Sequence, residues 1–178
     1  MMILKQVNVD MVNNLYKCYG FKCNLIVIIK KKKGRDFMTE KEKLFFEHEL
    51  KYLDYAKEGK MEEFWREIDE TWKTFDYPYY QDSLFYHIIE DIINVCIDMK
   101  NFEKANKYVS LLFISGQKRA DDGTRELLAA RLAYEQGDID VARELAYVCN
   151  EKSEGRRLKK HKELRELLKK MNSFDIRN

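Results

Sequence analysis

The sequence predicts an all-α fold made of antiparallel helical hairpins. Apolar residues recur at three- and four-residue steps along most of the chain, which is the spacing of one helix face. Residues that break helices are rare, because the 178 residues include one proline and seven glycines. A chain of this length, with 45% hydrophobic and 36% charged residues, can bury a core of its own. We therefore expect one domain of long amphipathic helices.

The pattern is clearest over residues 124–153. Two helix-period runs are separated by Gly137-Asp138, as expected for two antiparallel helices joined by a tight turn. Small residues stand where the helices would cross closely: Ala129, Ala130, Ala133, Ala142 and Ala146. A single hairpin cannot bury its apolar face, so neighbouring hairpins are expected to stack on it.

Two earlier hairpins follow the same pattern. The first runs from Leu44 to Phe75 and breaks at Gly59-Lys60. The second starts after a predicted N-cap at Asp82-Ser83 and breaks at Lys100-Asn101. The helix before that second break is apolar on several faces, which predicts a central position with neighbours on both sides.

The three breaks align as Gly59-Lys60-Met61-Glu62-Glu63-Phe64, Lys100-Asn101-Phe102-Glu103-Lys104-Ala105 and Gly137-Asp138-Ile139-Asp140-Val141-Ala142. Over about residues 44–153 the chain resembles the tetratricopeptide-repeat (TPR) family, in which such a turn joins the two helices of each repeat. The aligned positions are 41 and then 37 residues apart, whereas the family repeats every 34 or so. The resemblance implies a short right-handed solenoid over residues 38–155.

The resemblance also implies that the first helix of each hairpin lines a concave groove that binds another protein. Carried over from the turn alignment, the groove positions are Phe46, Glu49, Leu53 and Lys57, then His87, Glu90, Asn94 and Asp98, and finally Thr124, Leu127, Arg131, Tyr134 and Glu135. This mixed, mildly acidic set suits a peptide or helix with some positive charge. The carboxylate clamp of chaperone-adaptor relatives is not reproduced, because Glu49 and Leu53 replace its first pair.

Residues 156–178 are predicted to form a basic amphipathic capping helix and a tail. Its apolar stripe comprises Leu158, Leu164, Leu167, Leu168 and Met171, and a helix with a polar outer face is what a repeat array needs at its end. Residues 156–170 hold eight Lys or Arg against two Asp or Glu. A surface for RNA, DNA or an acidic protein is therefore the alternative.

Residues 1–37 do not continue the helical pattern, and they hold eight Lys or Arg against two acids. One hypothesis is that translation starts at Met38, because codons for Lys33-Gly34-Arg35 can spell a purine-rich tract like a bacterial ribosome-binding site. The rival is a genuine extension that forms a strand or stays disordered. The apolar run at residues 25–29 is too short to span a bilayer, and the lysines that follow it do not fit a signal peptide.

No pattern in the sequence indicates a reaction. We find no Gly-rich phosphate loop, GxSxG turn or HExxH pair, and the three histidines (His48, His87 and His161) are dispersed. Asp121-Asp122-Gly123 lacks the rest of a calcium loop. Cys18, Cys23, Cys96 and Cys149 are too scattered for a zinc site or a disulfide framework. We expect no enzyme, no cofactor and no metal, in a reducing, cytoplasmic compartment.

The expected function is that of a protein-protein interaction module: an adaptor, chaperone or regulator that binds a peptide or helix. Tyr79 and Tyr80, next to Pro78 in a predicted loop, are further candidate anchors. The alternatives are a regulator that contacts nucleic acid through the basic C-terminal helix, and a self-assembling protein such as a homodimer. We do not expect a membrane partner, and the acidic middle of the chain argues against nucleic acid.

Overall fold

A computed structural model describes residues 39–82, 84–114 and 122–174, with side chains as far as Lys169. The predicted all-α fold is confirmed, because these residues form helices and turns and include no strand. The hypotheses about residues 1–37 concern a segment outside the described residues. The helices from Lys41 onward belong to one unit.

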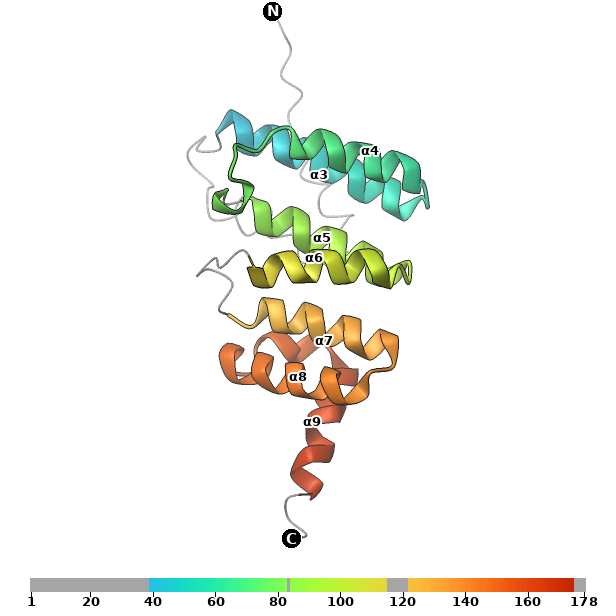
Figure 1. Ribbon diagram of the computed structural model, residues 1–178, viewed down its shortest axis with the longest axis vertical. Helices are drawn as coiled ribbons and strands as arrows, with labels where there is room; N and C mark the ends of the chain where they lie inside the picture. The colour runs from blue at the N-terminus through green and yellow to red at the C-terminus, as the bar shows by residue number, and fades with distance from the viewer. Residues whose placement is uncertain (1–38, 83, 115–121, 175–178) are drawn as a thin grey trace, which may run out of the picture. The chain divides into compact units, whose positions relative to one another are not determined.

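Seven α-helices and two short 3-10 helices make up the described part of the chain (Figure 1). In order they are α3 (Glu40–Lys57), α4 (Met61–Trp72), η1 (Tyr79–Gln81), α5 (Phe85–Asp98), α6 (Phe102–Ile114), α7 (Thr124–Gln136), α8 (Ile139–Ser153), η3 (Arg157–Lys160) and α9 (Lys162–Phe174).

Aromatic side chains hold α3 against α4 and the turn that follows α4. The rings of Phe45 and Phe75 stack with their centroids 5.9 Å apart, and Tyr52 meets Phe64 edge to face at 6.0 Å. All four side chains are buried. Such pairs add about 0.5–1.5 kcal/mol each to the free energy gained by burying their area, which explains why aromatic residues are frequent in this quarter of the chain.

Helix α5 lies at the centre of the described unit. It packs against α6 and α7, and its isoleucines Ile88, Ile89, Ile92 and Ile93 are completely buried. This agrees with the apolar character of several of its faces. Asp82 lies just before the helix and accepts a hydrogen bond from the backbone N–H of Leu84 at 2.9 Å, while Ser83, the other predicted cap residue, lies outside the described part.

The three aligned turns share one backbone structure. Gly59, Lys100 and Gly137 each take a positive φ, at 70°, 56° and 84°. The next residue donates its N–H to a carbonyl five positions back: Lys60 to Tyr55 at 2.9 Å, Asn101 to Cys96 at 2.8 Å and Asp138 to Ala133 at 2.9 Å. This bond ends each first helix in the manner of a Schellman motif. The sequence alignment therefore corresponds to a repeated backbone conformation.

Each turn also begins the second helix in the same way. The N–H groups of Phe64, Ala105 and Ala142 donate to the carbonyls of Lys60, Asn101 and Asp138, at 2.9, 3.0 and 2.9 Å. The three aligned side chains are all completely buried. Phe64 occupies the position where the other two turns have alanine.

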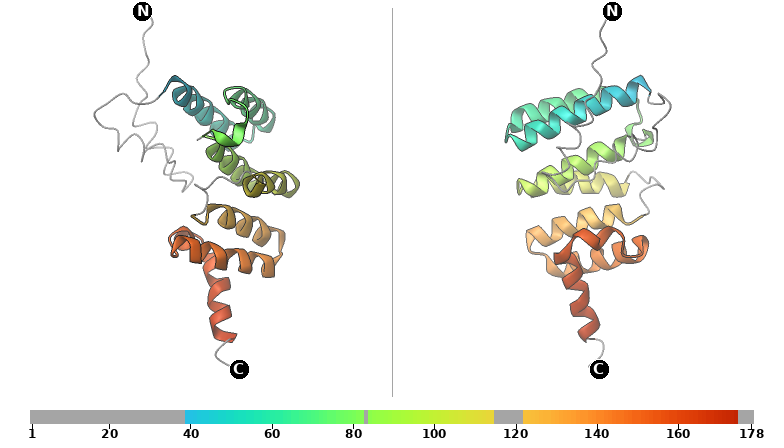
Figure 2. Two further views of the ribbon diagram at one scale, coloured as in Figure 1. Left: turned by 60° about the vertical axis from the view of Figure 1, so that its left-hand side comes forward. Right: turned by 180° about the vertical axis from the view of Figure 1, so that it is seen from behind.

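Helices α7 and α8 pack against each other, and α9 runs across their direction (Figures 1 and 2). The cluster that joins them has small residues from α7 and α8 at its centre and leucines from the C-terminal segment at its edge. Its buried members are Leu127, Ala130, Ala133, Ala142, Ala146, Cys149, Leu158, Leu164 and Leu167.

The C-terminal segment does not form the single helix expected from Arg156. Residues Arg157–Lys160 form the 3-10 helix η3, and α9 starts only at Lys162. The Arg156 Nε donates to the Ser153 carbonyl at 2.9 Å, and Glu154 takes a left-handed φ of 50°. The chain therefore turns sharply after α8, which brings both Leu158 and Leu164 into the same cluster.

We expect Ala142→Leu to destabilise the fold by about 2 kcal/mol, because a completely buried alanine leaves no room for three more carbon atoms. Urea unfolding followed by circular dichroism measures this loss. Val141→Leu is the control, since Val141 is exposed on the same helix and should change stability by less than about 0.5 kcal/mol. Equal effects of the two substitutions would contradict the close packing of α8.

Candidate binding pocket and buried carboxylates

Four of the predicted groove residues line one pocket. Asp98, at the end of α5, meets Arg131, Tyr134 and Glu135 of α7 around a cavity of about 360 Å³. The four residues come from the second and third predicted hairpins, so the turn alignment brought together positions that are more than thirty residues apart. The volume lies in the lower part of the range for ligand sites, roughly 300–1,000 Å³.

The pocket also has walls that the sequence did not predict. Ile97 lies near the end of α5 and Lys100 in the turn that follows, whereas His161 lies just before α9 and Glu163 in its first turn. His161 and Glu163 were missed because residues 156–178 were interpreted as a cap with a solvated outer face. Lys100 was missed because the groove positions were taken from the first helix of each hairpin, and Lys100 belongs to the turn after α5.

Arg131 is held in place by a neutral partner. Asn94, a predicted groove residue, is 2% exposed and accepts a hydrogen bond from the Arg131 guanidinium through its side-chain oxygen. The nearest carboxylate is Asp98, whose Oδ1 lies 4.0 Å from Nη2 of Arg131, beyond hydrogen-bond distance. The guanidinium is thus fixed in position, but no described carboxylate is close enough to form a hydrogen-bonded ion pair with it.

Burial shifts two titratable groups of the pocket. Burial raises the pKa of Asp98, and the charge of Arg131 offsets part of that rise. Burial, and then the charge of Arg131, lower the pKa of His161, while Glu163, 3.4 Å from Nδ1 of His161, acts in the opposite direction. His161 is therefore neutral at pH 7, and the charged groups of the pocket are two cations (Lys100 and Arg131) and three carboxylates.

The remaining groove positions lie elsewhere. Phe46 and Glu49 are buried on α3, and Leu53 and Lys57 are half-buried, with Lys57 bonded to Asp54 at 2.9 Å. On α5, His87 and Glu90 are half-buried, and Leu127 and Thr124 of α7 are buried. The ring of His87 lies 6.4 Å from that of Phe45. None of these eight residues lines the pocket.

Glu49 is a buried carboxyl of α3 and faces the half-buried Asp91 of α5. Its side chain is hydrogen-bonded to Asp91, and Asp91 also accepts a hydrogen bond from the Tyr52 hydroxyl at 2.7 Å. Among the described residues, the second carboxyl oxygen of Glu49 has no hydrogen-bond partner. Burial raises the pKa of Glu49 well above its usual value and that of Asp91 to about 7. The sequence predicts Glu49 as a groove residue and does not pair it with Asp91, because the two residues lie 42 positions apart on different helices.

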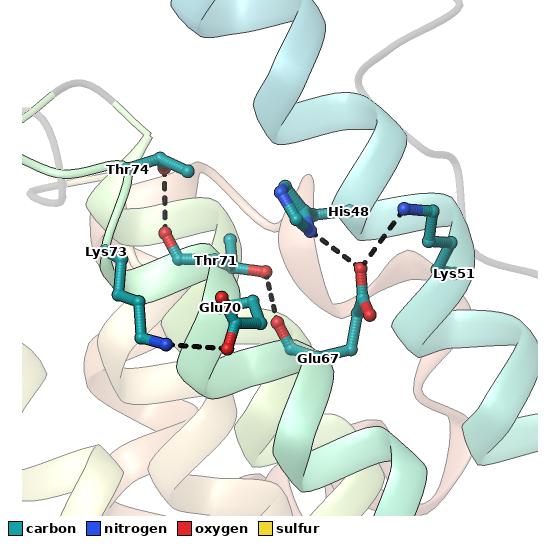
Figure 3. Close-up of polar contacts among 7 residues, drawn as sticks. All are labelled: His48, Lys51, Glu67, Glu70, Thr71, Lys73 and Thr74. Atoms are coloured by element: carbon teal, nitrogen blue, oxygen red, sulfur yellow. Dashed lines mark hydrogen bonds and ion pairs between the residues drawn. The ribbon is translucent and has the colours of Figure 1, made fainter.

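A second polar cluster links α3 to α4. Nδ1 of His48 lies 2.6 Å from Oε1 of Glu67, and Lys51 lies 3.6 Å from the same oxygen (Figure 3). The Thr71 hydroxyl donates to the Glu67 carbonyl at 2.7 Å. Every polar contact in Figure 3 is accounted for by partners within α3, α4 and the turn after α4, so the cluster joins the two helices.

The predicted tyrosine anchors are exposed. Tyr79 and Tyr80 lie in η1 with 44% and 46% of their surface accessible, and Tyr77 just before them is 86% exposed. Trp72 touches Tyr79, with ring centroids 5.9 Å apart. This surface lies outside the pocket.

Comparison with protein-family models, with curated proteins and with solved structures gives no match for this chain. In the described ranges, no three His, Cys, Asp or Glu side chains are grouped so as to hold a metal ion. Within those same ranges, no helix is both long and apolar enough to cross a bilayer.

Proposed function

We propose that this chain is a TPR-like interaction module that binds a peptide or helix of another protein, acting as an adaptor, chaperone or regulator. The observation that supports this best is the pocket at Arg131, where residues chosen from the turn alignment line one cavity with charges of both signs. The repeated turn geometry at Gly59, Lys100 and Gly137 adds support. The partner would dock against the ends of α5 and α7, beside the start of α9.

We expect Arg131→Glu combined with Tyr134→Ala to abolish partner binding, with circular dichroism as the check that the variant is folded. Both residues are half-buried and line the pocket, and reversing the charge of a fixed arginine places like charges against the partner. The full chain is first used in a pull-down from lysate of the source cell. Each recovered protein is then purified, and its affinity for wild type and for the variant is measured by titration.

The matched control is Arg143→Glu combined with Tyr147→Ala on α8. These residues are of the same types, and neither of them lines the pocket. A protein that binds wild type and this control but not the pocket variant supports the proposal. Equal binding to all three, or recovery that disappears on nuclease treatment, would contradict it. The second of those results would favour the basic C-terminal segment, where Arg156, Lys159 and Lys162 are exposed.

A further inference from the structure

We propose that the pocket at Arg131 recognises a partner segment in which an acidic and a basic side chain are neighbours. This inference rests on the proposed function and specifies its ligand. The acidic side chain would bind the Arg131 guanidinium, and the basic side chain would bind Glu135. Arg131 and Glu135 are four positions apart on α7, so both point to the same side of that helix.

Arg131 has unused capacity for a carboxylate. Its guanidinium carries five N–H donors, and a carboxylate is the group that matches their geometry best. One donor is taken by the neutral oxygen of Asn94, and Asp98 lies 4.0 Å away. The Arg131 side chain is only 19% exposed, and a charge removed from water to that extent gains from a close counter-charge. A carboxylate from the partner would supply it.

Glu135 is the complementary group. It is exposed at the rim of the pocket, and it makes no ion pair with any described residue. Its charge adds to those of Asp98 and Glu163 on the same cavity. A lysine or arginine of the partner at this rim would meet three carboxylates, whereas a second acidic residue there would meet repulsion.

The mixed lining explains why a ligand of a single sign is disfavoured. An acidic segment would be attracted by Arg131 but repelled by the three carboxylates of the pocket. A basic segment would be attracted by the three carboxylates but repelled by Arg131 and Lys100. A segment with both signs, in the right order, satisfies the whole pocket. Discrimination of this kind comes from the penalty on wrong partners as well as from the attraction of the right one.

The pocket is prepared for this role before binding. Asn94 of α5 is buried, with only 2% of its surface exposed, and it accepts a hydrogen bond from the Arg131 guanidinium. Arg131 therefore loses little rotamer freedom when a ligand binds. A long side chain that is not held in this way would lose about 0.5–1.5 kcal/mol on binding.

The test is selection from a phage-displayed library of random peptides on the full chain. Wild type should enrich peptides that carry an acidic residue beside a basic one. Arg131→Gln should lose the acidic preference and keep the basic one, and Glu135→Gln should do the opposite. A synthetic peptide with the wild-type consensus should bind Arg131→Gln at least about tenfold more weakly, the effect of losing one charge-assisted contact.

Arg143→Gln on α8 removes the same charge away from the pocket and should select the wild-type consensus. If Arg131→Gln fails to fold, Arg131→Lys replaces it: this variant keeps the positive charge and should retain the acidic preference. Glu135→Gln should fold normally, because Glu135 is exposed. Two results would overturn this inference but not the proposed interaction module. One is that wild type enriches peptides with charges of a single sign, and the other is that both glutamine variants select the same peptides as wild type. If wild type enriches no peptide, both proposals fall.

Discussion

The free energy of unfolding is expected to fall by on the order of 4 kcal/mol between about pH 4 and about pH 7, because Asp91 keeps a proton in the folded protein. Burial raises the pKa of Asp91 to about 7, against the opposing hydrogen bond from Tyr52. A carboxyl whose pKa is higher in the folded state contributes stability that is complete below its unfolded pKa. That stability is lost as the pH rises through the folded value, here about 7.

Glu49→Gln should leave the contribution of Asp91, which comes from burial, and remove the further pH dependence of Glu49 itself, whose pKa burial and the charge of Asp91 also raise. In the native chain Glu49 and Asp91 share a hydrogen bond that needs a proton, and the glutamine amide can donate to an ionised Asp91 without one. The variant should therefore be more stable than wild type at pH 8, by about 2 kcal/mol, and close to it at pH 5. Urea unfolding at both pH values measures the difference.

The control is Glu62→Gln on α4, an exposed carboxyl, which should leave the pH profile of wild type unchanged. Burial also raises the pKa of Glu90, next to Asp91. Its contribution to the pH dependence is the same in wild type and in Glu49→Gln, so it cancels when the two are compared. A wild-type chain whose stability is the same at pH 5 and pH 8 would show that the two carboxyls are ionised in the folded state.

Gly123→Ala is expected to destabilise the protein by about 3 kcal/mol. Gly123 precedes α7 with φ at 87°, a conformation that costs a residue with a Cβ about 1 kcal/mol. A Cβ at this position would also lie 2.9 Å from the carbonyl oxygen of Cys149 and 3.4 Å from its Cα. These are backbone atoms of α8, so relief requires the two helices to move apart, which disturbs the core around Cys149 and Ala146.

Gly137→Ala separates the two causes. Gly137 has nearly the same φ, 84°, but a Cβ there would meet nothing within 4 Å, so only the conformational cost of about 1 kcal/mol applies. Thermal and urea unfolding of the two variants, side by side, give the difference. If the two variants lose the same free energy of unfolding, α8 can move away from the new Cβ of Gly123→Ala without loss of stability, which would contradict close packing of the two helices.

The helices and their turns were accessible from the sequence because their causes are local. The aligned breaks at Gly59, Lys100 and Gly137 predicted where first helices end, and the hydrogen bonds that end them span only five residues. The boundary after α8 was predicted less well. The sequence pattern of leucines at 158 and 164 fits one helix, whereas the chain turns through η3 so that both reach the core formed by α7 and α8.

The sequence by itself determined the class of the fold and the three turns, since hydrophobic spacing and turn chemistry act over a few neighbouring residues. Only the tertiary structure decided which polar residues meet. Asn94 and Arg131 are 37 residues apart, and Tyr52 and Asp91 are 39 apart. His161 reaches the same pocket from beyond the last predicted hairpin. Such contacts, and the pKa shifts they cause, depend on distance and burial between helices, and no local pattern of residues encodes those quantities.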